Sequence, residues 1–222
     1  MELTVEWMRF GLLYFLPAVV YAFSFPQKNE IKSGKERRMI GGSIADDGEF
    51  PFMVAIFRTR KFCGGFTLIT TQTVLGAAHV IDSNAVEHSS NVQPIALLRD
   101  NKVVSSGDAM LIGWGRIGTS QDDVSECLHS AEVRIVDPED ESLDAYDIRI
   151  TGKEIITITP GVISMKGDSG SPLIIKDDSG RDIVIGLLSR GGNDVNEPDI
   201  YMSTCAYSTF IRRNTVGNLT YF

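Results

Sequence analysis

The segment MKGDSGSP, residues 165–172, places a serine in a glycine-rich stretch directly ahead of the apolar run PLIIK at 172–176. Gly167 and Gly170 bracket Asp168 and Ser169, so the backbone can turn tightly and expose the serine hydroxyl. This pattern is typical of a nucleophile loop, although Gly, Asp and Ser are also ordinary residues of tight turns. The rest of the chain must therefore supply the other groups that a serine hydrolase needs.

Short apolar runs separated by Gly, Asp, Asn and Ser lie on both sides of this segment. They span residues 52–57, 66–70, 109–114, 131–136, 172–176 and 182–189. This spacing predicts an all-β barrel or sandwich. Only residues 206–214 have helical spacing, with Tyr207, Phe210 and Ile211 at i, i+3 and i+4, so we expect one short C-terminal helix.

Length and charge limit the classes of protein to which the chain can belong. With 222 residues, 43% of them hydrophobic, it can bury one sizeable core or two small ones. The formal net charge is -8. A nucleic-acid partner is therefore not expected, because nucleic-acid binding needs a basic surface.

The N-terminus has the pattern of a secretory signal. Arg9 precedes an apolar run at 11–23, which is shorter than the roughly 20 residues of a membrane span. We expect a signal peptide at 1–22, cleaved after Ala22, and a secreted, extracellular product that leaves the membrane once the signal is removed. An uncleaved anchor is the alternative. Met8 is an alternative start, and Asn218 opens the glycosylation acceptor pattern NLT.

Four segments occur in a fixed order: RRMIGG (37–42), CGGFTLI to VLGAAHV (63–80), GWG (113–115) and GDSGSPL (167–173). This order resembles the trypsin-like, chymotrypsin-fold serine endopeptidases, from Met39 to about Arg213. The resemblance implies an all-β peptidase domain at 39–222 with two six-stranded antiparallel barrels. It also implies protein or peptide substrates, protein inhibitors as further partners, and neither a cofactor nor a metal.

The catalytic base must come from one of three histidines. A serine hydroxyl is a poor nucleophile at neutral pH and needs a neighbouring base, usually an imidazole. His79 ends an apolar run in the motif GAAHV, whereas His88 and His129 lie in stretches that read as polar loops. We therefore expect His79 to be the base and Ser169 the nucleophile.

Two further roles at the nucleophile loop follow from the resemblance. The N–H groups of Gly167 and Ser169 would form an oxyanion hole, in which each donor contributes about 2.7 to 4 kcal/mol. Residues 23–38 would be an activation propeptide, polar and exposed at 25–38. Cleavage after Arg38 by an activating protease would free Met39, whose amino group would pair with Asp168.

The Asp that orients the histidine in this family has no counterpart here. The stretch NVQPIALL (91–98) matches a family segment that lies shortly before GWG, so only residues 80–90 follow His79 before it. We therefore expect a truncated first barrel with unpaired edges and an exposed core. Asp82, Glu87 and Asp100 are the nearest acids, and none stands in a matching motif.

Two hypotheses about function follow from this gap. The first is a secreted serine endopeptidase, made as a zymogen and weakly active in this chain. The second is a catalytically inactive homologue that acts as a binding or regulatory protein.

The cysteine pattern departs from the family as well, because Cys63 and Cys127 would face the apolar residues Val80 and Ile175, which predicts buried free thiols.

Four residues are expected to form the primary substrate pocket: Ile163 at the floor, with Ser189, Gly191 and Asp199 around it. Asp199 stands where the family usually has Gly. A buried carboxylate needs a partner, so a basic substrate side chain would fit, whereas Ile163 narrows the floor and favours an apolar one. The alternative is that Asp199 pairs with a nearby group of the protein.

Overall fold

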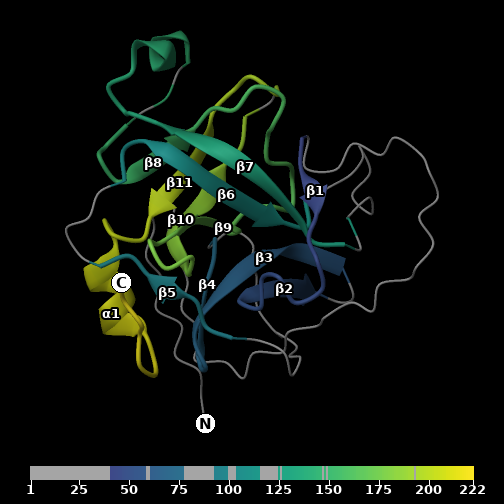
Figure 1. Ribbon diagram of the computed structural model, residues 1–222, viewed down its shortest axis with the longest axis vertical. Helices are drawn as coiled ribbons and strands as arrows, with labels where there is room; N and C mark the ends of the chain where they lie inside the picture. The colour runs from purple at the N-terminus through teal and green to yellow at the C-terminus, as the bar shows by residue number, and fades with distance from the viewer. Residues whose placement is uncertain are drawn as a thin grey trace.

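The computed structural model describes residues 41–58, 61–77, 93–99, 104–115, 125, 127–146, 148, 150–192 and 194–222. The strands among these residues form two β-sheets, one of eight strands and one of three (Figure 1). The signal, propeptide, Met39 and His79 all lie outside the described residues.

The eight-stranded sheet closes on itself. Seven of its strands follow the order β1-β7-β6-β9-β10-β11-β8, and the eighth, β5, pairs with β10. β8 pairs back with β7 through Ile135 and Thr157, which closes a six-stranded barrel. A closed barrel leaves few exposed edges, so this half of the molecule is complete. The strands are β1 (Ser43–Ile44), β5 (Ala96–Leu97), β6 (Gly107–Gly113), β7 (His129–Val136), β8 (Glu154–Thr157), β9 (Pro172–Lys176), β10 (Asp182–Arg190) and β11 (Asp199–Ser203).

Large aliphatic and aromatic side chains fill one core cluster of this sheet. Leu111, Leu173, Ile185 and Tyr201 are each no more than 1% exposed and belong to the same cluster. Burying a side chain of this size contributes about 1.5 to 3 kcal/mol. β6, β9, β10 and β11 are therefore held together by a shared core as well as by backbone hydrogen bonds.

The three-stranded sheet contains β2 (Met53–Arg58), β3 (Lys61–Thr70) and β4 (Thr73–Leu75), in the order β2-β3-β4. Alternate side chains of this sheet pack into two different core clusters, because successive side chains of a strand point to opposite faces. Met53 and Ala55 belong to the larger core cluster, whereas Val54 and Ile56 belong to a smaller one with Phe66. The described residues of this sheet form three strands and not a closed barrel.

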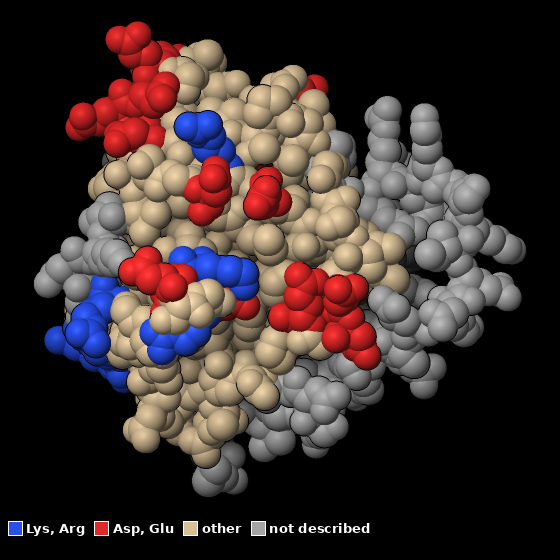
Figure 2. Space-filling model, in the orientation of Figure 1, with Lys and Arg blue, Asp and Glu red and all other residues tan. Residues whose placement is uncertain are grey.

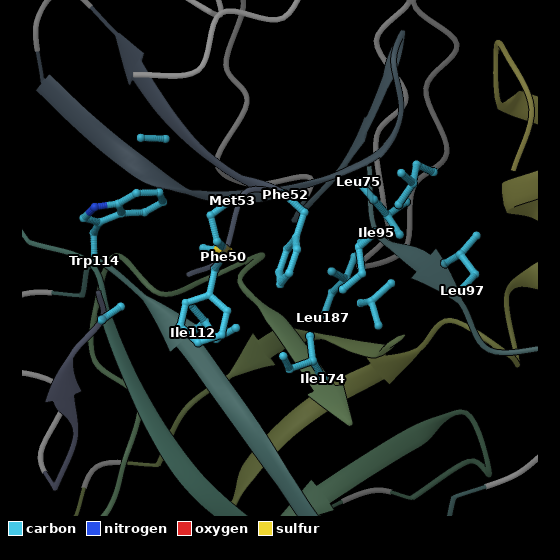
Figure 3. Close-up of a cluster of buried hydrophobic side chains, with 14 of the residues drawn as sticks. Phe50, Phe52, Met53, Leu75, Ile95, Leu97, Ile112, Trp114, Ile174 and Leu187 are labelled. Atoms are coloured by element: carbon cyan, nitrogen blue, oxygen red, sulfur yellow. The ribbon is translucent and has the colours of Figure 1, made fainter. Parts of the chain in front are cut away.

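The larger cluster joins the two sheets (Figure 3). Phe52, Met53 and Leu75 of the three-stranded side pack with a set from the eight-stranded side that comprises Ile112, Trp114, Ile174 and Leu187. Phe50 and Phe52 meet edge to face, with ring centroids 6.0 Å apart. This shared core fixes the relative position of the two sheets. That position brings residues 165–171, the predicted nucleophile loop, against β3.

The C-terminal residues, 208–222, contact both sheets. α1 (Ser208–Asn214) buries Ile211 in the larger cluster. Beyond it, the Thr70 hydroxyl donates to the Val216 carbonyl at 2.6 Å, and Leu97 N–H donates to the Thr220 carbonyl at 2.9 Å. The Arg181 guanidinium lies 3.5 Å from the centroid of the Phe222 ring.

The all-β fold, the six apolar strands and the single short helix are as predicted, and other expectations need correction. His129 is not in a polar loop: it lies in β7 and is only 2% exposed. The described core of the three-stranded sheet is not exposed, since Val54, Phe66 and Val74 are each 0% exposed. Cys63 and Cys127 form no disulfide, as predicted, but they are half-buried and not fully buried.

The sequence also failed to indicate several short elements. They are β1, β4, β5, β8, β11 and the 3-10 helix η2 (Glu141–Ala145). Figure 2 shows acidic side chains gathered at the top of the view, over the segment of η2; Glu141 and Asp144 lie in its first turn. Among the described residues, no helix is both long enough and apolar enough to cross a membrane.

Candidate active site

The nucleophile loop is a pair of tight turns that ends in β9. Asp168 N–H donates to the Met165 carbonyl at 3.0 Å, and Ser171 N–H donates to the Asp168 carbonyl at 2.9 Å. Gly167 and Gly170 have φ of 103° and 87°. Other residues rarely adopt this region, so both turns depend on glycine. Ser169 is half-buried between the fully buried Asp168 and Ser171.

Two hydrogen bonds attach the loop to β10. Gly170 N–H donates to the Leu188 carbonyl at 2.8 Å, and Leu188 N–H donates to the Ser171 carbonyl at 2.9 Å. These bonds place Ser169 beside the residues that follow Leu188. One of them is Ser189, a predicted pocket residue, which is half-buried.

The loop also touches the other sheet through Gly170. A Cβ at this position would lie 2.6 Å from the Ala77 nitrogen and 2.9 Å from the Gly65 oxygen. Only glycine allows so close an approach of backbone to backbone. Ala77 is two residues before His79 in the sequence. The nucleophile loop therefore contacts the segment that leads directly into the predicted base.

Two N–H groups of the loop are left available. The Gly167 and Ser169 N–H groups have no acceptor in the part of the chain that the structure describes, whereas those of Asp168, Gly170 and Ser171 are all bonded. A pair of unbonded N–H groups flanking a serine can donate to an anionic oxygen. These are the two residues that the sequence proposes for the oxyanion hole.

Asp168 is a completely buried carboxyl group that accepts two backbone hydrogen bonds. Its Oδ1 accepts from Gly115 N–H at 2.7 Å and its Oδ2 from Met165 N–H at 2.9 Å. Burial raises the pKa of Asp168 to about 6; these two bonds offset part of that rise, and the nearby Asp199 adds to it. No Lys or Arg among the described residues forms an ion pair with it. The Asp168 carboxyl group thus has no cationic partner among the described residues.

The carboxyl group of Asp168 explains why the GWG segment needs its two glycines. A Cβ on Gly113 or on Gly115 would collide with the carboxylate of Asp168. Trp114 between them is 6% exposed, and its ring lies 6.2 Å from that of Phe62 in an edge-to-face arrangement. Two glycines therefore make room for the Asp168 side chain while the tryptophan anchors the segment.

The predicted pocket residues converge at the edge of the same barrel. A Cβ on Gly191 would clash with Ser164 Oγ and lie 3.1 Å from Asp199 Oδ1, and one on Gly192 would lie 3.1 Å from Ile163 Cδ1. Ile163 is 2% exposed and Asp199 3%. The structure brings Ile163, Gly191 and Asp199 together.

Asp199 is engaged by neighbours that the sequence did not indicate. Its Oδ1 accepts from the Ser164 hydroxyl at 2.7 Å and its Oδ2 from Ser164 N–H at 2.9 Å. Gly192 N–H donates to Oδ1 at 3.3 Å. Burial raises the pKa of Asp199, and these hydrogen bonds oppose the rise. Hydrogen bonds from the protein itself thus satisfy part of what the Asp199 carboxylate can accept. In the sequence, the only signal for Ser164 is that it is the polar neighbour of Ile163.

Several predicted residues cannot be placed. Arg38, Met39 and His79 lie outside the described residues, as do the candidate orienting acids Asp82, Glu87 and Asp100. Asn218 is described and is exposed.

The site has clear relatives among known proteins. The family described as "Trypsin" matches residues 39–88 and 81–211, in two pieces. Cerastocytin, a thrombin-like enzyme of Cerastes cerastes, is 22% identical, with 90% of this chain and 93% of that protein aligned. Coagulation factor XII of Cavia porcellus is 24% identical over 81% of this chain but only 41% of its own length. Granzyme B of Rattus norvegicus is 30% identical over 57% of this chain and 50% of its own.

The alignments bear on the missing segment as well. The one with cerastocytin runs over 251 positions, more than the 222 residues of the chain, so some aligned positions have no residue here. The two pieces of the family match overlap at residues 81–88, just after the predicted base His79.

Proposed function

This chain belongs to the trypsin family of serine proteases, and from that premise we propose that it is a secreted serine endopeptidase, made as a zymogen and weakly active. The observation that carries the proposal is the placement of the nucleophile loop. The N–H groups of Gly167 and Ser169 have no acceptor among the described residues, and the loop contacts Ala77, two residues before His79.

The proposed reaction is acyl transfer to Ser169. His79 removes the proton from Ser169 Oγ as this oxygen attacks the carbonyl carbon of the scissile peptide bond. The Gly167 and Ser169 N–H groups donate to the resulting oxyanion. His79 then gives the proton to the leaving amine, and water hydrolyses the acyl-enzyme by the same steps in reverse order.

The proposed activation supplies the cation that Asp168 lacks. A protease cuts after Arg38, and the freed amino group of Met39 pairs with the Asp168 carboxylate. The support is the complete burial of this carboxyl group and the absence of an ion-pair partner among the described residues. A buried charge is costly unless it is paired, so the pairing would hold the loop in one conformation.

The proposed pocket takes either a basic or an apolar side chain. Asp199 supports a basic guest because its buried carboxylate has no cation among the described residues, and Ile163 supports an apolar one. The hydrogen bonds from Ser164 and Gly192 lower the need of Asp199 for a charged partner. Cleavage of a peptide library by the activated protein decides between the two.

Secretion and glycosylation belong to the same proposal. A signal at 1–22 would route the chain to the cell exterior, and the exposed Asn218 would then be accessible to a glycan. Expression in secreting cells tests both. The secreted product should begin at Phe23, and Asn218→Gln should remove the shift in mobility that a glycosidase removes from the wild type.

A second function is supported by a specific observation. The alignment with cerastocytin leaves some aligned positions without a residue of this chain, and none of the acids Asp82, Glu87 and Asp100 stands in a motif that matches the family's orienting Asp. An inactive homologue would keep the fold as a binding surface for another protein. The enzyme and the homologue differ in whether Ser169 reacts.

Labelling of Ser169 by a fluorophosphonate tests the proposed function. We expect residues 23–222, cut after Arg38, to incorporate the label on Ser169, as located by mass spectrometry. Ser169→Ala should abolish it, and Ser179→Ala, which changes an exposed serine in a turn, should not. Absence of label on the cut wild-type chain would refute the enzyme and favour the homologue.

A further inference from the structure

Arg190 is an exposed cation beside the nucleophile loop that no described residue neutralises. It is the last residue of β10 and lies two residues beyond Leu188, whose backbone is bonded to Gly170 and Ser171. It forms no ion pair or side-chain hydrogen bond with the described residues. In a chain of net charge -8, a free cation this close to Ser169 suggests attraction of a negative group.

The strand edge next to Arg190 is open on one side. On the side of β11, Arg190 lies opposite Ile200. On the side of β9, the pairing ends at Leu187 and Pro172, followed only by the two bonds of Leu188. No described strand continues beside residues 189–191, and the Gly191 N–H has no acceptor there. An extended peptide could therefore add to this edge.

The direction of such a peptide follows from β9. β9 is antiparallel to β10, and the chain leaves the line of β9 by turning at the nucleophile loop. A peptide that continues this line, running in the direction of β9, passes residue 191 first and reaches Ser169 last. The carbonyl that arrives at Ser169 is then the one that is cleaved, and the residues before it lie alongside Arg190.

We propose that Arg190 is a specificity-determining residue that favours peptides with an acidic side chain two to four residues before the cleaved bond. The inference rests on the proposed function, because it assumes that peptides reach Ser169. Arg190 would act by an exposed ion pair with the substrate and would take no part in bond breaking. An arginine can engage a carboxylate through two parallel hydrogen bonds, which suits it to this role.

The size of the effect is set by exposure. An exposed ion pair contributes about 0.2 to 1 kcal/mol, which corresponds to a preference of about 1.4- to 5-fold. Salt screens such a pair, so raising the ionic strength should reduce the preference. A change of this size affects the choice among peptides but not whether the enzyme works.

Two matched assays test the inference. Decapeptides with Lys or Leu directly before the cleaved bond, and with Glu, Gln or Lys as the second, third or fourth residue before that bond, are offered to the chain cut after Arg38, and kcat/KM is measured. The same peptides, labelled with fluorescein, are bound to the Ser169→Ala chain, and dissociation constants come from fluorescence anisotropy. Binding needs no catalysis, so the second assay works even if the chain is inactive.

The variants isolate the guanidinium. We expect Glu to be favoured over Gln by about 1.4- to 5-fold in the wild type, kept in Arg190→Lys, lost in Arg190→Gln and inverted in Arg190→Glu. Arg213→Gln, which changes an exposed arginine of α1, should leave the preference intact. Unchanged melting temperatures would show that the variants are folded.

The outcomes separate the two claims. Binding that prefers Glu in an Arg190-dependent way, without cleavage, supports the role of Arg190 and refutes the peptidase. Cleavage with equal use of Glu and Gln, or a preference that survives Arg190→Gln, overturns the role of Arg190 and leaves the peptidase standing. A chain that neither binds nor cleaves any of the peptides overturns both.

Discussion

The two sheets of this protein differ in completeness, and the site is divided between them. The eight-stranded sheet closes into a barrel and carries the nucleophile loop, Asp168 and Asp199. The described part of the other half has three strands, and the predicted base His79 follows it in sequence. The predicted nucleophile and oxyanion residues are therefore held by the closed barrel, whereas the predicted base lies outside the described residues.

The contact between the halves gives the largest expected effect. Gly170→Ala should destabilise the protein by about 3 kcal/mol or more, because it adds backbone strain at φ 87° and a clash with Ala77 and Gly65. Chemical denaturation measures the loss. Gly180→Ala is the matched control, since Gly180 has φ 79° and nothing within 4 Å of a Cβ. Equal losses in the two variants would mean that the sheets do not meet closely at Gly170.

The buried acid of the complete half gives the next effect. In the uncut chain the folded Asp168 keeps its proton up to a pKa of about 6, whereas the ordinary value is 3.8. Its contribution to stability is therefore fully present below pH 3.8 and is lost as the pH rises through 6, by about 3 kcal/mol. Denaturation from pH 4 to 7, with Asp168→Asn as reference, measures this loss.

Cleavage after Arg38 sharpens the same experiment. If the Met39 amino group pairs with Asp168, it lowers the pKa of this carboxyl group, and the loss of stability with rising pH should disappear in the cut chain. An identical loss before and after cleavage would refute the pairing.

The pocket gives a smaller effect. If Asp199 receives a basic side chain, Asp199→Asn should lower the kcat/KM for Lys and Arg substrates by about 10-fold or more, because a charge-assisted hydrogen bond contributes about 1.5 to 3 kcal/mol. Apolar substrates should be less affected. Asp108→Asn, which changes an exposed acid of β6, is the control. No preference for Lys or Arg in the wild type would exclude the basic pocket.

The cysteines give the smallest effect. Cys63, Cys127 and Cys205 form no disulfide, so no such bond constrains either half. A reducing agent should change the free energy of unfolding by less than about 0.5 kcal/mol, as expected where no such constraint is lost. A drop of 2 kcal/mol or more would be typical of a lost disulfide and would contradict this account.

Sequence patterns predicted the parts of the fold in which an apolar run is continuous. β9 and β10 have such runs, and both were predicted. β11 was missed because its first residue is the buried Asp199, and β8 because only four residues pair between polar neighbours. His129 was misjudged because polar residues precede it in sequence, while its burial depends on pairing with β1 and β6.

The sequence likewise indicated only those parts of the candidate site that are contiguous in the chain. Ser169, Asp168 and their glycines are contiguous, so one motif contains them. The bond between Ser164 and Asp199 joins residues 35 positions apart, and nothing local in the sequence indicates it. Likewise, Arg190 has no ion-pair partner among the described residues because of which strands lie beside β10, and only the topology shows those strands.

The steady-state kcat of the chain cut after Arg38, on a peptide ester, tests the central claim most directly. Loss of the carboxylate that orients the imidazole lowers kcat about 10⁴-fold in Ser-His-Asp enzymes. Typical enzymes turn over at about 1 to 10³ s⁻¹. We therefore predict a kcat on the order of 10⁻⁴ to 10⁻¹ s⁻¹ that Ser169→Ala abolishes. A kcat in the usual range would contradict it and would mean that an acid such as Asp82, Glu87 or Asp100 orients His79.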